Sequence, residues 1–390
     1  MRRPRLRLSP QRLVLNGLVL LALLAGCDRS PEEPQAPADT PSSEPLQQTE
    51  PEQEAATARA WQLGGDWLEA AQAECRELHR ELETFLDQPE EAALERTRAQ
   101  WHQCHDRWHR LAPLLALSES NPGLFGELER MAFNIDAHPL QPGYLDALPQ
   151  YPHSGIVNDI TLDIKADTLR DQHGLTDSTD VSLGLHAIEF LLWGETGKRP
   201  VSDYQRQTRA EDENLDKELT QEKLPRNRRR ELVLLLSNLL QDDLQSMHRQ
   251  WTSESGHLQQ TYRQLRPASQ LQLLKGAARQ LLEQQLVTEL QTLSDPELAH
   301  NRFAGEGLRP ILSALQGLQT LMTQGEQPLT QWLGEPEATA QWREQLETIP
   351  ADLQEAKASD DEFSPDALTS QLLLLGTFLQ PVNDLEAVAP

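Results

Sequence analysis

One short apolar run carries two residues whose types and spacing suggest chemistry. Residues 184–194 read Gly-Leu-His-Ala-Ile-Glu-Phe-Leu-Leu-Trp-Gly, and His186 and Glu189 are the only ionisable side chains in it. At positions i and i+3 of a helix, the two side chains lie on one face. Burying an imidazole and a carboxylate is unfavourable unless they pair, bind a metal ion or face a water-filled cleft. The spacing alone leaves these three explanations open.

A metallopeptidase interpretation of this run is incomplete. The inverted zincin motif H-x-x-E-H requires a second histidine where the chain has Phe190. The run therefore offers one nitrogen and one carboxylate, whereas a catalytic zinc usually has three protein ligands. Glu297 and His300 form a second pair at i and i+3 and could supply more. A histidine with carboxylates suits Fe, Zn or Cu without distinguishing among them.

Two other regions contain candidate ligands. Residues 119–160 are rich in Pro, Gly, aromatic residues and Asp, which predicts a long irregular segment of the kind that often carries function. Three histidines also lie close together on a predicted helix, but His105 shares an apolar face with Trp101 and Trp108, and we interpret this histidine cluster as structural. The polar side chains of the irregular segment could line a site or only form hydrogen bonds with the loop backbone. They are Asp136, His138, Tyr144, Asp146, Tyr151 and Asp159. The histidines on the predicted helix are His102, His105 and His109.

The elements that position these residues are predicted to be helices throughout. Apolar residues recur every three or four positions over long stretches, and no alternating strand pattern of useful length occurs. Long helices separated by Pro- and Gly-containing turns are typical of all-α proteins packed as bundles. The predicted helices span residues 62–87, 90–117, 231–251, 268–294, 307–324, 338–357 and 365–379.

Cys75 and Cys104 are predicted to form a disulfide. Their midpoint falls at residues 88–90, Gln-Pro-Glu, which we interpret as the turn between the first two long helices. Positions equidistant from such a turn lie at the same height, and helix axes about 8–10 Å apart bring facing Cα atoms within disulfide range. An oxidising compartment permits the bond. The alternative is a pair of buried thiols.

The N-terminus has the pattern of an exported lipoprotein. Residues 1–26 combine five arginines with a short apolar stretch, which indicates a signal peptide. The sequence Leu-Ala-Gly before Cys27 resembles a lipobox, so we expect cleavage before Cys27 and a lipid anchor on it. Asp28 resembles an inner-membrane retention signal of enteric bacteria, which leaves the choice of membrane open. Residues 27–57 are acidic and Pro-rich and are predicted to be a disordered tether that holds the folded part on the periplasmic face of the envelope.

Charge excludes two classes of partner. The formal net charge is −26. Loss of the five signal-peptide arginines would bring the mature chain to about −31, with no acid removed. A chain this acidic does not bind nucleic acid or dock electrostatically on anionic lipid. The lipid on Cys27 is the only membrane contact that we predict.

The run 184–194 resembles the GxHxxE motif of the imelysin-like family, also called the M75 peptidases. The segment QPGYLDALPQYPHSGIVNDITL and the Trp-rich second helix are similar to that family as well, so the resemblance covers roughly residues 60–385. It implies two related helical bundles, at approximately 58–205 and 206–386, with a site at their interface that includes Gly184, His186 and Glu189. One departure is that residues 303–305 read Phe-Ala-Gly where many members have Phe-Ser-Asp.

The resemblance implies a role in the cell envelope, because the family includes iron-regulated envelope proteins and a periplasmic partner of a ferrous-iron uptake system. We therefore expect a lipoprotein that binds a divalent or ferric metal ion, or a metal-linked ligand, in iron uptake or homeostasis, with an envelope protein as its partner. The alternatives are an M75-type metallopeptidase and a non-catalytic scaffold for a peptide or polysaccharide. The expected metal ligands are His186 and Glu189, and the further candidate ligand-binding residues are Gly184, Asp136, Asp146, Asp159, Glu297 and His300.

Overall fold

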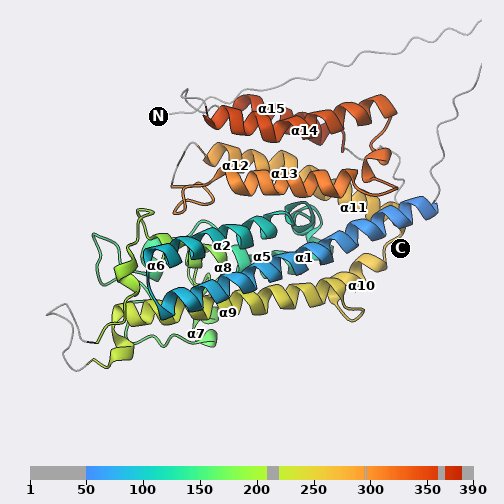
Figure 1. Cartoon of the computed structure of the whole chain (residues 1–390). Helices are drawn as coiled ribbons and strands as arrows, with labels where there is room; N and C mark the ends of the chain where they lie inside the picture. Colours follow the sequence, from blue (N-terminus) through green and yellow to red (C-terminus); the bar gives the residue numbers. More distant parts are fainter. Residues whose placement is uncertain (1–49, 209–218, 294, 296, 359–364, 380–390) are drawn as a thin grey trace, which may run out of the picture. The chain divides into compact units, whose positions relative to one another are not determined.

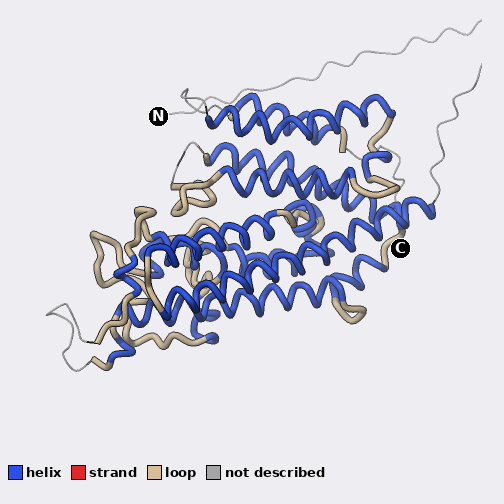
Figure 2. Tube along the Cα trace, viewed as in Figure 1, coloured by secondary structure: helices blue, strands red, loops and turns tan. Residues whose placement is uncertain are grey.

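The computed structural model describes residues 50–379 except 209–218, 294, 296 and 359–364. The predicted signal peptide, Cys27 and most of the predicted tether lie outside these residues. Within them the chain is all-α, as predicted: no strand occurs, and the one β-bridge joins Leu148 to Tyr151 (Figure 2). None of the described helices is long and apolar enough to cross a membrane.

The first helical hairpin is formed by α1 (Glu50–Asp87) and α2 (Glu91–His109), and Cys75 and Cys104 form the predicted disulfide across it. Helix α1 begins at Glu50, inside the predicted tether 27–57. In this overlap Thr57 is buried, and its hydroxyl donates a hydrogen bond to the side chain of Gln270 at 2.7 Å. The predicted tether boundary at residue 57 is therefore too late.

Helix α2 ends eight residues before the predicted boundary at 117. Pro113 has no N–H to continue the hydrogen bonds of α2. Two short helices follow α2: α3 (Ala112–Leu115), which contains Pro113, and α4 (Leu117–Ser120). The segment predicted to be irregular then forms a 15-residue helix, α5 (Pro122–Asp136), before a true loop begins. The Gly and Pro residues near its start hide this helix in the sequence.

The middle of the chain contains short elements around one long helix. These are α6 (Pro142–Leu145), α7 (Ala166–Gln172), α8 (Gly184–Trp193), η1 (Val201–Tyr204), η2 (Gln221–Lys223), α9 (Pro225–Thr252) and α10 (His257–Arg263). Helix α9 packs along α1 and also contacts α5 and α8. Helix α9, which follows the predicted division between residues 205 and 206, therefore packs mainly with helices that precede it.

The C-terminal helices follow the predicted ranges closely. They are α11 (Pro267–Gln280), the π-helical turn η3 (Leu281–Gln285), α12 (Leu286–Thr292), α13 (Leu308–Thr323), η4 (Leu329–Trp332), α14 (Pro336–Ala358) and α15 (Asp366–Thr377). Figure 1 shows α14 and α15 in one layer, α12 and α13 in the next, and then α2 and α1. Contacts of α13 with α2 and α3, and of α11 with α1 and α4, join the two groups of helices. The candidate site lies where these groups meet.

Candidate metal centre at the helix interface

Helix α8 is buried along its whole length, as its apolar run predicts. Its first residue, Gly184, has φ +81°, and a Cβ atom there would lie 2.4 Å from the carbonyl oxygen of Ile135. Only glycine allows both this backbone conformation and this approach. The glycine of the motif therefore lets the start of α8 lie against the end of α5, beside Asp136.

His186 and Glu189 pair with each other inside the protein. Nδ1 of His186 lies 2.7 Å from Oε2 of Glu189. The other oxygen, Oε1, accepts hydrogen bonds from the main-chain N–H groups of Phe303 and Ala304 at 3.0 and 2.9 Å. Both oxygens of Glu189 are thus engaged, and the pairing leaves Nε2 of His186 pointing away from Glu189.

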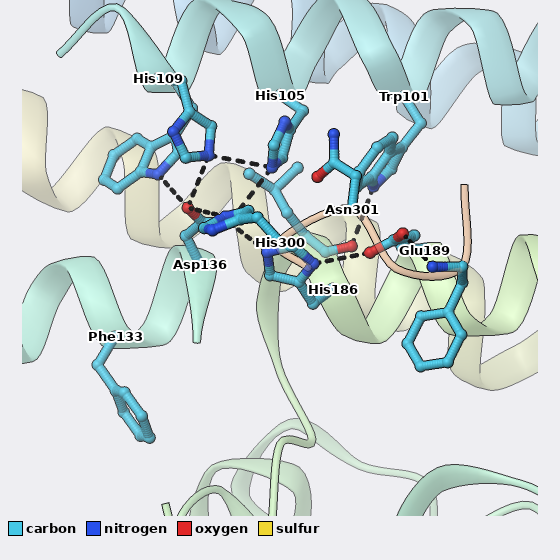
Figure 3. Close-up of polar contacts among 12 residues, drawn as sticks. Trp101, His105, His109, Phe133, Asp136, His186, Glu189, His300 and Asn301 are labelled. Carbon is cyan, nitrogen blue, oxygen red and sulfur yellow. Dashed lines mark hydrogen bonds and ion pairs between the residues drawn. The ribbon is translucent and has the colours of Figure 1, made fainter. Parts of the chain in front are cut away.

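Four side chains converge on the far side of His186. Ligand atoms of His105, Asp136, His186 and His300 all lie within 4.8 Å of one another. Asp136 is central: its Oδ1 is 3.2 Å from Nε2 of His186 and 3.7 Å from Nε2 of His105, and its Oδ2 is 3.5 Å from Nε2 of His300 (Figure 3). These residues come from α2, α5, α8 and the loop between α12 and α13. We call them the His3Asp cluster.

Several atoms of the His3Asp cluster are paired only within the cluster. Oδ1 of Asp136, Nε2 of His186 and Nε2 of His300 are buried, and in the described ranges they meet one another as the ion pairs given above, without the alignment of a hydrogen bond. Buried polar atoms in proteins nearly always have a hydrogen-bond partner. Three imidazoles and a carboxylate are also a donor set that binds first-row transition metals. The cluster therefore fits a metal ion on both counts.

A second layer of contacts surrounds the cluster. Oδ2 of Asp136 accepts a hydrogen bond from Nε1 of Trp108 at 2.9 Å and lies 3.1 Å from Nε2 of His109. Nδ1 of His300 lies 3.0 Å from Oε1 of Glu289 on α12. His300 and His186 thus each have a carboxylate behind one ring nitrogen, an arrangement that fixes the tautomer and orientation of metal-binding histidines.

The charges of the site are strongly coupled. Burial opposes the charged form of His186 and His300, but the carboxylates of Asp136, Glu189 and Glu289 around them outweigh it, so the pKa of His186 is raised and that of His300 lies well above its usual value. Burial would raise the pKa of Glu289, but His300, with His138 and His109, lowers it to about 2. Binding of a metal to these nitrogens would therefore release protons.

The pKa values of Asp136 and His105 are both lowered, for different physical reasons. Burial would raise the pKa of Asp136, but contacts with His109, His186 and His300 hold it well below its usual value. Burial, with the neighbouring imidazoles, holds the pKa of His105 well below its usual value. Asp136 is thus an anion and His105 a neutral imidazole at ordinary pH, the forms in which both bind metals.

A sequence profile of the Imelysin family, also called peptidase M75, matches residues 67–375. The chain belongs to the imelysin family. Among solved structures, a Parabacteroides distasonis ATCC 8503 protein described as an iron-regulated protein A precursor has the same fold, with a TM-score of 0.61 at 11% identity, over 86% of this chain and 95% of that one. No curated protein matches. The family resemblance seen in the sequence is confirmed over nearly the predicted extent.

The segment that departs from the usual imelysin pattern still reaches the site. Its side chains read Phe-Ala-Gly at 303–305, but the contacts to Glu189 come from main-chain N–H groups, which every residue except proline supplies. His300, just before it, contributes its imidazole. The loss of Ser-Asp therefore leaves the contacts with Glu189 in place.

The imelysin fold brings together some of the sequence-predicted residues and separates others. Gly184, Asp136, His186, Glu189 and His300 meet at the cluster. Glu297 instead forms an ion pair with Arg302, and its side chain is 69% exposed. Asp159 caps its own turn, accepting hydrogen bonds from the backbone and hydroxyl of Thr161.

Asp146 is also separate from the cluster and is engaged elsewhere. It is fully buried, and its carboxylate is bound by Arg229 from α9, at 2.6 and 3.0 Å, and by Arg199 at 3.0 Å. The neighbouring Arg228 donates to four main-chain carbonyls of the same loop, those of Ile156, Val157, Asp159 and Leu162. These arginines hold the loop after α6 against α9.

The histidines of α2 lie nearer the candidate site than their pattern suggests. The sequence favours a structural role for His105 and His109, because His105 shares a face with Trp101 and Trp108, and in the structure both histidines lie beside Asp136. Only His102 points elsewhere, with its ring against Trp101 and Trp193. Nothing in the sequence singles out Glu289, because it lies on an ordinary amphipathic helix.

Proposed function

We propose that this imelysin-family protein binds a metal ion at the His3Asp cluster, on the periplasmic face of the envelope, and serves in iron uptake or homeostasis. The observation that carries the proposal is the convergence of His105, Asp136, His186 and His300, whose buried ligand atoms face one another without well-aligned hydrogen bonds. We assign these four as ligands. Glu189 then acts behind His186 and not as the direct ligand expected from the sequence.

The choice of iron rests on the fold comparison, because the donor set alone does not select among metals. Three nitrogens and one carboxylate oxygen suit Fe, Zn or Cu. The solved structure with the same fold is described as an iron-regulated protein, which favours iron among these metals. When bound, the ion would supply a Lewis-acidic or redox-active centre, and the protein would set its charge and its access to solvent.

The decisive test is metal analysis of protein purified without chelator, followed by titration with Fe²⁺, Fe³⁺, Zn²⁺ and Cu²⁺. We expect one equivalent in the wild type and losses greater than the 10–100-fold typical of outer-shell changes in Asp136→Asn and His186→Ala. His102→Ala is a matched control, because His102 lies on α2 beside the cluster and does not contact Asp136. Equal affinity in all four proteins would refute the metal site and favour a non-catalytic peptide or polysaccharide scaffold.

The structure removes one objection to the alternative function of a metallopeptidase. Three imidazoles and a carboxylate meet the ligand number that the run 184–194 alone did not provide. A general base is still needed, and Glu189 has both oxygens engaged. The test is cleavage of an unfolded protein substrate. Metal-dependent cleavage that Asp136→Asn abolishes, and that added metal does not restore in any variant, would support the peptidase over a binding role.

A further inference from the structure

A cavity beside the cluster is much larger than a metal ion needs. Its volume is about 490 Å³, whereas one water molecule occupies about 30 Å³ in the liquid. Cavities of roughly 300–1,000 Å³ are the usual size for small organic ligands. Asp136 and His300 line this cavity, so it reaches two of the four proposed metal ligands.

The walls of the cavity come from both groups of helices and are mainly apolar. Ala112 and Leu115 belong to α3, Ala132 and Phe133 to α5, and Ile311 to α13. The lining also includes Leu281 of the π-helical turn η3, and such turns are frequent at functional sites. An apolar wall of this kind favours a ligand with an aromatic or aliphatic face over water or an aqua ion.

The charges around the cavity select among organic ligands. Glu119, Glu129 and Glu289 line it together with Asp136, and no lysine or arginine is among the described residues of its lining. Glu119 bridges the two helix groups by accepting hydrogen bonds from Gln280 and Gln285 at 2.8 Å. The four carboxylates outnumber the three imidazoles of the lining, those of His109, His138 and His300, and His300 is itself a proposed metal ligand. An anionic chelator would therefore meet an excess of negative charge, at an unfavourable electrostatic energy.

We propose that the cavity holds a small organic chelator that is neutral or cationic, has nitrogen donors and an apolar ring or chain, and completes the coordination of the metal bound by the His3Asp cluster. This proposal rests on the proposed function, since it requires the metal. Four protein ligands leave two positions open on a six-coordinate ion, which suits a bidentate ligand. The protein thus binds a metal complex of defined charge in place of the bare ion.

Two matched chelators test the proposal on Fe²⁺-loaded protein without oxygen. 2-(Aminomethyl)pyridine and pyridine-2-carboxylate share one ring and one chelate size but differ in charge. Calorimetry gives the affinity of each chelator for the Fe²⁺-loaded protein, and this value is divided by the affinity of the same chelator for aqueous Fe²⁺. The ratio should be roughly tenfold higher for the amine than for the carboxylate. Ala132→Phe, which fills the cavity, should abolish chelator binding and leave Fe²⁺ affinity unchanged.

Charge variants give an independent arm. Glu129→Lys should reduce or invert the preference for the amine, whereas Glu127→Lys, on the same helix but outside the lining, should not. Suppose that Fe²⁺ binds but the two chelators bind equally well, strip the ion from the protein, or bind equally well to Ala132→Phe. Any of these results refutes the chelator proposal and leaves the metal site in place. If Fe²⁺ itself does not bind, the proposed function fails and the chelator proposal fails with it.

Discussion

Glu189 and Glu289 stand behind His186 and His300, where a carboxylate raises the basicity of the imidazole and fixes its ring. Replacing either with glutamine keeps its size and one acceptor oxygen but removes the charge. We therefore predict that Glu189→Gln and Glu289→Gln each lower metal affinity about 10–100-fold without preventing binding. Competition titration with a chromogenic chelator measures this, and Glu129→Gln, a carboxylate of the cavity wall, is the control.

The same titration separates two roles for Glu189. If Glu189 were a direct ligand, Glu189→Gln should lower the metal affinity as much as His186→Ala does. If the two variants prove equally defective, our assignment of Glu189 to the outer layer is wrong.

Asp146 contributes to stability and not to the metal site. Removing its charge in Asp146→Asn leaves Arg229 and Arg199 buried without their carboxylate, which should lower the free energy of unfolding at neutral pH by about 3–5 kcal/mol. Metal affinity per folded molecule should be unchanged. Urea unfolding monitored by circular dichroism, beside metal titration, checks both parts.

The pH dependence of this effect follows from the sign of the pKa shift. Burial would raise the pKa of Asp146, but Arg229 and Arg199 lower it below the unfolded value of about 3.9. A carboxyl with a lowered folded-state pKa contributes its full stability above the unfolded pKa and loses it as pH falls through the folded pKa. The gap between wild type and Asp146→Asn should therefore be constant above about pH 5 and shrink below about pH 4. A gap that widens in acid would contradict this account.

The junction of α5 and α8 sets the geometry of the cluster through one glycine. Gly184→Ala introduces a Cβ that meets the Ile135 carbonyl in a backbone conformation unfavourable for alanine. We predict a loss of at least about 2 kcal/mol in the free energy of unfolding, and weaker metal binding because His186 moves relative to Asp136.

Gly276→Ala is the matched control for this variant. Gly276 lies in α11, and apart from its chain neighbours and the backbone of its own helix no described atom is within 4 Å of the position that an alanine Cβ would take. Alanine there should therefore stabilise the helix by up to about 1 kcal/mol. Thermal unfolding and metal titration of both variants test the pair. Similar stability of the two would remove the special role of the α5–α8 junction.

Helix positions were predictable wherever apolar periodicity was unbroken. The predicted range 268–294 covers α11, η3 and α12, and 307–324 covers α13, because Leu residues follow one face there. The prediction failed for α5, where Pro122, Gly123 and Gly126 suggested a loop. Local composition is a weak guide when a proline stands at the first helical position, where its missing N–H costs nothing.

The residues of the candidate site were predictable only where polar groups interrupted an apolar run. His186 and Glu189 stood out for that reason. His105 did not, because a buried metal ligand and a buried structural histidine leave the same pattern on a helix face. Asp136 and Asp146 looked equivalent in sequence, and only the packing of α9 assigns Arg229 to one of them. Contacts between residues 105, 136, 186 and 300 depend on how the helix groups join, which no local pattern encodes.

Attachment to the envelope is the remaining prediction for the whole molecule, and it depends on Cys27, outside the described residues. Lipid on this cysteine would carry several acyl chains, which anchor a protein far more firmly than the single chain that gives marginal binding. Cys27→Ser should therefore move the protein from the membrane fraction to the soluble fraction of the envelope. The described helices begin at Glu50, and those that hold the His3Asp cluster begin later still, so the soluble form should keep its metal affinity.

Asp28→Ser is the control for this experiment, because it leaves the lipidated cysteine intact and changes only the proposed sorting residue. It should stay in the membrane fraction and, under the enteric rule, shift from inner to outer membrane. Fractionation with an alkaline wash, together with labelling by a fatty-acid analogue, follows both variants. Cys27→Ser protein that resists the wash would overturn the lipid anchor, whereas unlabelled but membrane-bound wild type would point to attachment through a protein partner.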